Sequence, residues 1–504
     1  MGASSLEKHS DGESAEQEQY GMGQLHHLGT VDAYATADSF DAKEESRLRL
    51  KMDLALIPLV SLLYLLAFID RANIGNAKIA GLDKDLGLHG FDYNAALSVF
   101  YVSYILFEIP CNTLCKFIGP GWFIPATTLG FGILTICNAF VTDFSTLCAV
   151  RFLLGIFEAG MMPSLVLYLS RWYRQSELTF RVSLFIISAS LAGAFGGLLA
   201  SAILRLDNFG RLHSWRMIFA IEGIGTSVIS AISFFLLPGG PETAMWLSPR
   251  EKELAIRRLK SERIATTELV DQFSWNKIRL GIFNPVVLST AVIFLFDCIT
   301  VHGVSFFLPT IVKTIFPDHS VASQQLLTVP PYVVGAIACA STSYVSWRVN
   351  RRGIFMILCA PFSVLGYAMF LGSTHPGVRY GATFLPFLGI FTYGALTNSH
   401  VSANVVSDTA RSSAIATNVM VGNIGGLIST WAFLSTDAPN YHIGNGLNLA
   451  AQTSICLIAT GLYFWMKKDN KKRDAVDSVA VLRNKSAKEV VEMDWKHPDF
   501  RWKL

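Results

Sequence analysis

Twelve long apolar stretches constrain the fold of this 504-residue chain more than any other feature. A helix needs about 20 apolar residues to cross a bilayer core of about 30 Å, and stretches of that length recur along the sequence. Charged residues make up 16% of the chain, against about 25% in soluble domains, so water is not its main solvent. We therefore expect an all-α membrane protein whose twelve transmembrane helices cover residues 54–78, 95–115, 122–141, 146–170, 182–204, 215–237, 285–313, 324–347, 353–373, 379–403, 411–434 and 446–466.

The segments outside these stretches divide the chain into five parts. Residues 1–50 are polar and lack the apolar core of a signal peptide, so we expect a disordered cytosolic tail. Residues 51–240 hold six crossings, and residues 241–284 form a charged cytosolic loop. Residues 285–470 hold the other six crossings, and residues 471–504 form a second cytosolic tail.

The distribution of Lys and Arg predicts the orientation in the membrane. The loops on one side carry most of the positive charge, while the other side holds few basic residues beyond Arg205, Arg211 and Lys313. The positive-inside rule then places both termini and the central loop in the cytosol. We expect a multi-pass protein of the plasma membrane that works as a monomer in the lipid bilayer, with no nucleic-acid partner.

The two sets of six helices also resemble each other in sequence. Residues 154–160 (LGIFEAG) parallel residues 388–394 (LGIFTYG), and residues 193–199 (GAFGGLL) parallel residues 422–428 (GNIGGLI). The two matches occur in the same order and at a similar offset, which indicates a duplication. Two duplicated six-helix bundles predict the major facilitator fold, with the substrate held near the midplane between the halves.

Charged residues within the predicted helices are the first candidates for function. A charge at the centre of a lipid-facing helix costs about 2.5–3.5 kcal/mol, so such residues face a partner or a cavity. Arg151 and Glu158 lie two turns apart on one face, about 10 Å from each other. Gly155 between them is expected to leave a space that a substrate could occupy. The alternative for Arg151 is a structural ion pair with a neighbouring helix.

The second half lacks both of these charges. By the repeat, Leu385 and Thr392 occupy the positions of Arg151 and Glu158. The duplicated fold can therefore form without charges at these positions, so the fold alone does not explain Arg151 and Glu158. This asymmetry suggests that the first half handles protons and anion charge, while the second half offers polar contacts.

The end of the first predicted helix is also unusually polar. Asp70, Arg71 and Asn73 follow a nearly unbroken apolar run. The helix could end here at the outer interface, but Ile74 and Ala77 continue the apolar pattern beyond the charges. We expect these polar side chains to lie inside the membrane, as candidates for proton and substrate binding.

Polar residues on three further helices add candidates. Tyr104 and Glu108 share one face of the helix at 95–115, and Glu108 is expected to act as a gate between the halves. Lys116 and Arg348, in loops on the basic side, are further gating candidates. The helices of the second half offer possible substrate ligands at Tyr393, Asn398, His400, Asn404 and Asn423.

Asp297 and His302 are two further ionisable residues, within the stretch 285–313. They could form a second proton station, or they could be a pair that satisfies itself inside the helix bundle. The residues alone leave both interpretations open.

Three motifs carry a resemblance to a known family. They are Asp70-Arg71-x-Asn73-x-Gly75-Asn76-Ala77, Glu108-Ile109-Pro110-x-Asn112 and Arg151-x-x-x-Gly155-x-x-Glu158-Ala159-Gly160. The chain resembles the anion:cation symporter family of the major facilitator superfamily over about residues 50–470. That family includes fungal allantoate, nicotinate and pantothenate permeases.

The resemblance implies proton-coupled import of a small organic anion. Asp70 and Glu158 would take up protons, and Arg71 and Arg151 would hold the anion. The chain has no phosphate-binding glycine loop and no metal-spaced set of His or Cys, so we predict neither an enzyme nor a bound cofactor or metal. Two alternatives stay open on the same fold: a metabolite exporter, and a nutrient sensor that does not transport.

Overall fold

A computed structural model of the chain describes residues 41–206, 212–267, 275–349, 351–482, 489–490 and 492–504. Regular structure in these residues is helical. The helices are α2 (Ala42–Ile79), α3 (Leu82–Asp85), α4 (Asp92–Ile118), α5 (Pro120–Asn138), α6 (Phe144–Ala159), α7 (Met161–Ser170), α8 (Gln175–Ile203), α9 (Trp215–Leu236), η1 (Pro241–Thr243), α10 (Pro249–Thr267), α11 (Trp275–Ile282), α12 (Pro285–Ile315), α13 (Val321–Val349), α14 (Arg352–Gly372), α15 (Pro376–Phe387), α16 (Ile390–Ala403), α17 (Asp408–Ser429), η2 (Ser435–Asp437), α18 (His442–Asp474), α19 (Ser478–Leu482) and η3 (Asp494–Lys496).

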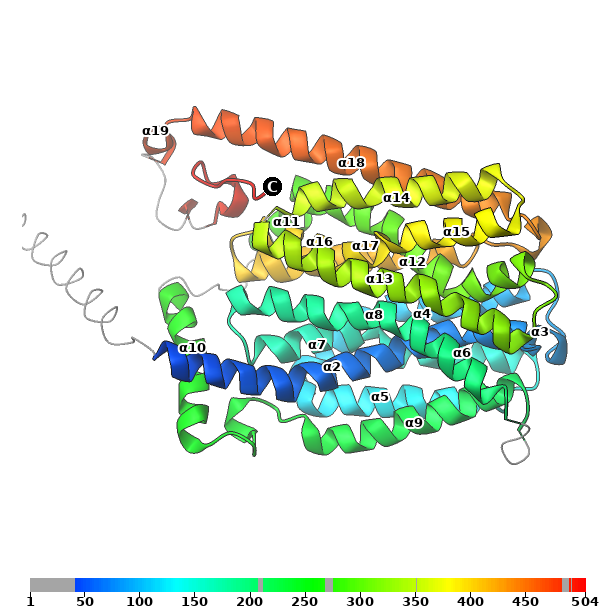
Figure 1. Cartoon of the computed structure of the whole chain (residues 1–504). Coiled ribbons are helices and arrows are strands. Elements are labelled where there is room, and N and C mark those ends of the chain that lie inside the picture. The colour runs from blue at the N-terminus through cyan, green and yellow to red at the C-terminus, as the bar shows by residue number, and fades with distance from the viewer. Residues whose placement is uncertain (1–40, 207–211, 268–274, 350, 483–488, 491) are drawn as a thin grey trace, which may run out of the picture.

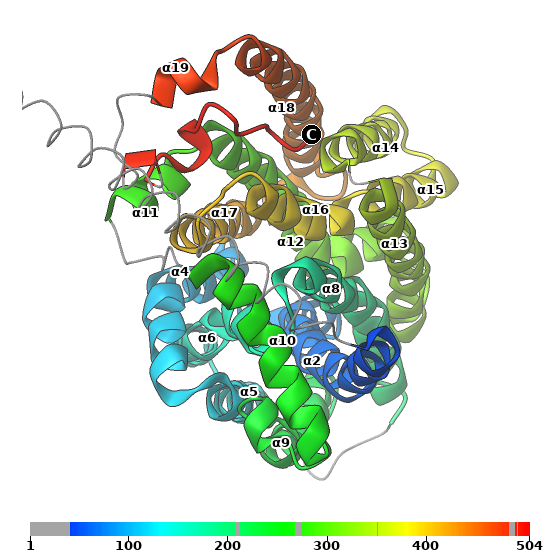
Figure 2. The same ribbon diagram turned by 90° about the vertical axis from the view of Figure 1, so that its left-hand side faces the viewer.

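The long helices lie side by side along one direction (Figure 1) and, seen end-on, form two groups, α2–α9 and α12–α18 (Figure 2). Ten helices of the described residues are long and apolar enough to cross a membrane, with α6 and α7 counted as one. The other two predicted crossings correspond to α17 and to the pair α15–α16, which is broken after Phe387. The predicted all-α fold of two six-helix bundles is confirmed.

The molecule has two distinct ends. We call the end that carries the start of α2, the crosswise helix α10 and the C-terminal residues the terminal face, on the left of Figure 1. We call the other end, with α3, the opposite face. The first helix begins at Ala42, twelve residues before the hydropathy pattern predicts, because its first turns are charged and contact the terminal face. The rest of the expected N-terminal tail, residues 1–40, lies outside the described residues.

Several helix boundaries have local causes in the sequence. Asp143 and Thr146 form a capping box that starts α6. Asn284 caps α12 and is followed by Pro285 at the first helical position, where the missing N–H costs nothing. Gly119 has a φ of +92°, in the left-handed region that favours glycine, and so lets α4 turn directly into α5.

The repeated glycines have equivalent neighbours in the two halves. A Cβ placed on Gly196 would lie closest to α2, and one placed on Gly425 would meet the backbone of α12. A Cβ on Gly197 would meet α13, and one on Gly426 would meet the ring of Tyr101 on α4. Since α2 and α12 open the two halves and α4 and α13 follow them, the sequence repeat corresponds to a repeated packing of helices.

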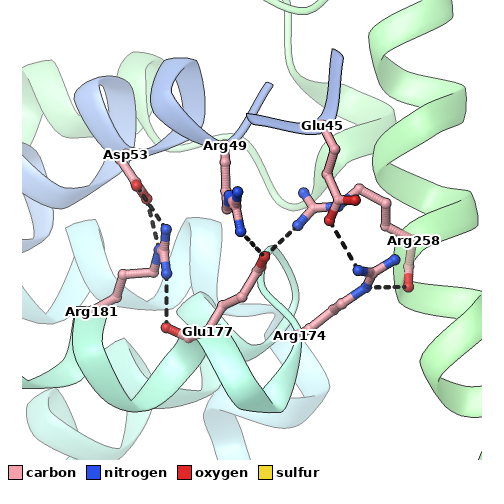
Figure 3. A network of polar contacts seen from close by, with 7 residues as sticks. All are labelled: Glu45, Arg49, Asp53, Arg174, Glu177, Arg181 and Arg258. Atoms are coloured by element: carbon pink, nitrogen blue, oxygen red, sulfur yellow. Dashed lines mark hydrogen bonds and ion pairs between the residues drawn. The ribbon is translucent and has the colours of Figure 1, made fainter. Parts of the chain in front are cut away.

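An ion-pair network fixes the central loop to the N-terminal half at the terminal face (Figure 3). Arg258 of α10 is 2% exposed and pairs with Glu45 of α2 at 3.0 Å and with Glu177 of α8 at 2.7 Å. Arg174 reaches the same Glu45 carboxylate at 2.9 Å. The loop helix is therefore part of the N-terminal half's surface in this structure.

Residues 494–504, which we call the C-terminal segment, pack on the ends of the C-terminal helices. Trp502 is only 3% exposed. The side chain of Asn404, at the end of α16, donates to the backbone oxygen of Lys503 and accepts from its N–H. The Asp494 carboxylate accepts from the N–H of Ser407 at the start of α17. This part of the chain is a packed element of the C-terminal half.

Candidate functional site

A cavity of about 80 Å³ lies between the two halves. Helices α2, α4, α7 and α8 line it from the first half, and α12, α16 and α17 line it from the second. Much of its wall is apolar or aromatic, including Phe68, Met161 and Phe391. The predicted site residues that line it are Arg71, Tyr104, Asp297, His302 and Asn423.

Arg71 places a buried cation at the cavity wall. Its Nε donates a hydrogen bond of 2.6 Å to Oε2 of Glu158, and the two side chains are 7% and 0% exposed. The guanidinium lies 5.0 Å from the ring centre of Phe68, 5.5 Å from that of Phe100 and 4.9 Å from that of Tyr104. Aromatic faces attract a cation at such distances, so these rings and the carboxylate hold the arginine in place.

Asp70 and Arg151 extend this charged cluster into the N-terminal half. Asp70 is 3% exposed and accepts a hydrogen bond of 2.5 Å from Thr135 of α5. Arg151 lies over the ring of Phe219 on α9, at 5.9 Å, and interacts electrostatically with Asp70 and Glu158. The structure therefore brings the four predicted charges together, since α2 continues beyond Asp70 to Ile79 and keeps its carboxyl inside the bundle.

The cluster has unused hydrogen-bonding capacity among the described residues. Oδ2 of Asp70, Oε1 of Glu158, and Nε and Nη2 of Arg151 are buried and have no hydrogen-bond partner there. Buried polar atoms in proteins are usually paired, because burial removes the water that would otherwise bind them. Unpaired polar atoms of this kind are suited to a site where side chains exchange hydrogen-bond partners between conformations.

The space predicted between Arg151 and Glu158 is not present. A Cβ on Gly155 would overlap Oγ of Ser103 and the backbone oxygen of Phe100, both on α4. Gly155 lets α6 pack closely against α4. The prediction of a substrate space at this point is therefore wrong. Arg151 itself lies outside the cavity lining.

Two polar residues at the cluster were not singled out from the sequence. One is Thr135, which binds Asp70; the other is Glu222 of α9, whose Oε2 accepts a hydrogen bond from Nδ2 of Asn73. Asn73 is fully buried and does not line the cavity. Glu222 could have been found, because it is the only acidic residue in the predicted crossing 215–237.

Most of the candidate ligands of the second half contact their own half. Tyr393 donates to a backbone oxygen of α14 at 2.7 Å. Asn398 donates to a backbone oxygen one turn earlier and accepts from Asn418. His400 is 1% exposed, and Asn404 binds the C-terminal segment. These four predicted ligands lie outside the cavity lining, and Asn423 alone of the five lies in it.

The gating candidates lie at two different depths, one beside the cavity and two at the terminal face. Glu108 accepts a hydrogen bond of 2.8 Å from Asn423 and so joins α4 of the first half to α17 of the second, beside the cavity. Lys116 and Arg348 lie near the ends of α4 and α13 at the terminal face, where both are exposed.

Asp297 and His302 both face the cavity from α12 and are 1% and 5% exposed. Oδ1 of Asp297 has no hydrogen-bond partner among the described residues. The His302 ring lies 5.3 Å from the Tyr101 ring and 6.5 Å from the Phe68 ring. The histidine therefore has an aromatic environment, with rings from two helices of the other half.

Polar contacts also join the halves between the cavity and the opposite face. Nδ2 of Asn94 donates to the backbone oxygen of Thr430 at 2.6 Å, and the hydroxyls of Ser98 and Thr430 are 2.8 Å apart. Nε1 of Trp431 donates to Ser98 at 2.9 Å. We call these contacts between α4 and the end of α17 the outer seam.

The geometry defines a class of protein: two duplicated six-helix membrane bundles with a charged cavity between them. The sequence profile of the Major Facilitator Superfamily matches residues 60–430. The chain belongs to this superfamily and is a multi-pass membrane transporter, not an enzyme.

Fungal transporters are similar over most of the chain. An uncharacterized transporter of Schizosaccharomyces pombe is 34% identical and covers 87% of this chain and 90% of its own. The high-affinity nicotinic acid transporter of Saccharomyces cerevisiae is 31% identical over 86% of this chain and 80% of its own.

Among solved structures, a bacterial homologue of the human lysosomal transporter Spinster, in an inward-facing and unoccupied conformation, has the same fold. It superposes with a TM-score of 0.60 at 15% identity, covering 84% of this chain and 97% of its own.

Proposed function

We propose that this protein imports a small organic anion, a monocarboxylate such as nicotinate, pantothenate, allantoate or a related acid, together with protons. The observation that carries the proposal is Arg71, a buried guanidinium at the wall of the central cavity whose charge is balanced by Glu158. The similarity to a nicotinic acid transporter supports this class of substrate. In this proposal the protein is a monomer of the plasma membrane with both termini in the cytosol.

The coupling follows from competition for one guanidinium. Glu158 accepts from Nε of Arg71 and neutralises the guanidinium, so its charge and its Nε edge are not free for the carboxylate of a substrate. When Glu158 takes up a proton, it loses its charge and Arg71 can bind the substrate anion instead. Asp70 stands in the same cluster beside Arg151 and supplies a second carboxyl that can hold a proton.

The cavity wall fits a small, partly flat anion. Phe68 and Tyr104 flank Arg71, and Asn423 offers an amide from the second half. A planar acid could stack on the rings while its carboxylate meets the arginine.

The test is uptake of labelled organic acids, nicotinate among them, into proteoliposomes under an inward proton gradient. The variants are Arg71→Met, Arg71→Lys and Glu158→Gln, with Arg257→Ala as control, because Arg257 is an exposed residue of α10. We expect Arg71→Met to lose uptake and Arg71→Lys to keep part of it. Glu158→Gln should lose gradient-driven accumulation but keep exchange of labelled for unlabelled substrate.

Gradient-driven uptake that survives both Arg71→Met and Glu158→Gln would refute these roles. If the parent takes up no acid but releases a preloaded acid when the gradient is reversed, the protein is an exporter.

A further inference from the structure

We infer that Glu222 is a third proton-binding carboxyl of this transporter, lying in series with Asp70 and Glu158 and nearer to the opposite face. The inference rests on the proposed proton coupling and adds a residue to it.

The first support is the position of Glu222 among the helices of the N-terminal half. Its carboxylate accepts a hydrogen bond from Asn73 of α2, and the amide oxygen of Asn73 accepts in turn from Asn76. Oε1 of Glu222 is buried and has no hydrogen-bond partner among the described residues. A carboxyl with one oxygen bound by a neutral amide, the other buried, and no basic residue paired with it in the described part of the chain can exist with or without a proton.

The second support is the depth of the three carboxyls. With a rise of 1.5 Å per residue, Glu222 lies about 10 Å from the start of α9 at the opposite face, and Asp70 lies about 13 Å from the end of α2 at the same face. Glu158 lies about 21 Å from the start of α6 there. The three carboxyls therefore lie at increasing distance from the opposite face, and the deepest of them, Glu158, pairs with Arg71 at the cavity wall.

The third support is the charged surroundings of Glu222. From α2, Asp70 interacts with it electrostatically. The guanidinium of Arg151 lies over Phe219, one turn before Glu222 on the same helix. Helix α5, which packs along α9, contains no Asp, Glu, Lys, Arg or His, and α8 carries its charged residues only in its first turns. Asp70 is therefore the charged group that responds directly to a proton on Glu222, and Arg151 interacts in turn with Asp70.

The sequence repeat gives a comparison within the molecule. The last helix of the second half, α18, contains no Asp or Glu between residues 443 and 468. Glu222 therefore follows the pattern of Glu158, whose position in the second half is taken by Thr392.

The experiment compares Glu222→Gln with the parent in proteoliposomes, and Glu253→Gln is the matched control because Glu253 is exposed on α10. A glutamine can still accept from Asn73 but cannot exchange a proton. We expect Glu222→Gln to lose at least tenfold in gradient-driven accumulation, to keep exchange at equal pH within about twofold, and to show a flatter dependence of exchange on pH.

A purely structural role would leave the pH profile and the accumulation of Glu222→Gln like those of the parent, which would overturn the inference. Failure of the parent to respond to a proton gradient would instead overturn the proposed function.

A second measurement needs no variant and covers the case in which Glu222→Gln does not fold. Dicyclohexylcarbodiimide attacks protonated carboxyls in apolar surroundings, and peptide mapping shows where it reacts. We expect modification of Glu222 in the parent to fall as the pH rises from 5 to 8. Modification that does not change with pH would refute a proton-binding role.

Discussion

The ion pair between Arg71 and Glu158 allows a quantitative prediction for Arg71→Met. The substitution keeps an unbranched apolar stem but removes the guanidinium, which leaves the carboxylate of Glu158, 0% exposed, without its cation. Removing one partner of a buried pair costs about 3–5 kcal/mol, and the lost contacts with the three rings add about 0.5–2 kcal/mol. For a unit the size of the N-terminal half each kcal/mol lowers the melting temperature by about 2–4 °C, so we expect a drop of at least about 7 °C at pH 7.

The double variant Arg71→Met with Glu158→Gln identifies the cause of that drop. It removes the uncompensated charge, so it should melt higher than Arg71→Met alone. The loss in Arg71→Met should also shrink as the pH falls, because a protonated Glu158 carries no charge. The assay is thermal unfolding of the purified protein followed by intrinsic fluorescence, with Arg257→Ala as control.

A melting temperature of Arg71→Met within about 2 °C of the parent would refute this reasoning. So would a double variant no more stable than Arg71→Met, since the loss would then come from packing.

Three further predictions concern packing and the terminal face. Gly155→Ala should separate α6 from α4 and lower the melting temperature, whereas Gly225→Ala, where an added Cβ meets nothing within 4 Å, should leave it unchanged. Trp502→Ala should lower the free energy of unfolding by about 3–5 kcal/mol, since a large buried side chain is lost. It should also speed proteolysis of the C-terminal segment, and equal proteolysis rates in variant and parent would contradict the packing of this segment. Lys51 and then the N–H of Ser248 hold the pKa of Glu251 below its ordinary value. The contact between α10 and α2 made by Glu251 is therefore present at neutral pH and is lost as the pH falls through that lowered pKa. Crosslinking of Cys variants flanking this pair that is equally efficient at pH 3 and pH 7 would show that Glu251 does not hold the two helices together.

Hydropathy could predict the fold because the bilayer imposes one length on every crossing. The same signal could not place the start of α2, since the turns from Ala42 onward leave the apolar layer and are held by ion pairs with residues far along the chain. Such pairs have no local signature in the sequence.

The N-terminal charges were predictable because a charge within an apolar helix is rare and costly. Polar residues are a weaker signal: Asn404 lies on a polar stripe and Tyr393 lies near it, but both contact their own half. A stripe shows that one face of a helix meets polar groups, but not whether those groups belong to a ligand or to the protein. The partner of Asn404, Lys503, lies 99 residues away in the chain, beyond the reach of helical periodicity.

The docking of the C-terminal segment has a consequence for the biogenesis of the protein. Residues 494–504 leave the ribosome after every helix that they contact, including α16 and α17. Translation proceeds from the N-terminus, and domains generally fold in that order. The N-terminal half can therefore complete its packing while synthesis continues, whereas the second half receives these contacts only after residues 494–504 have been made.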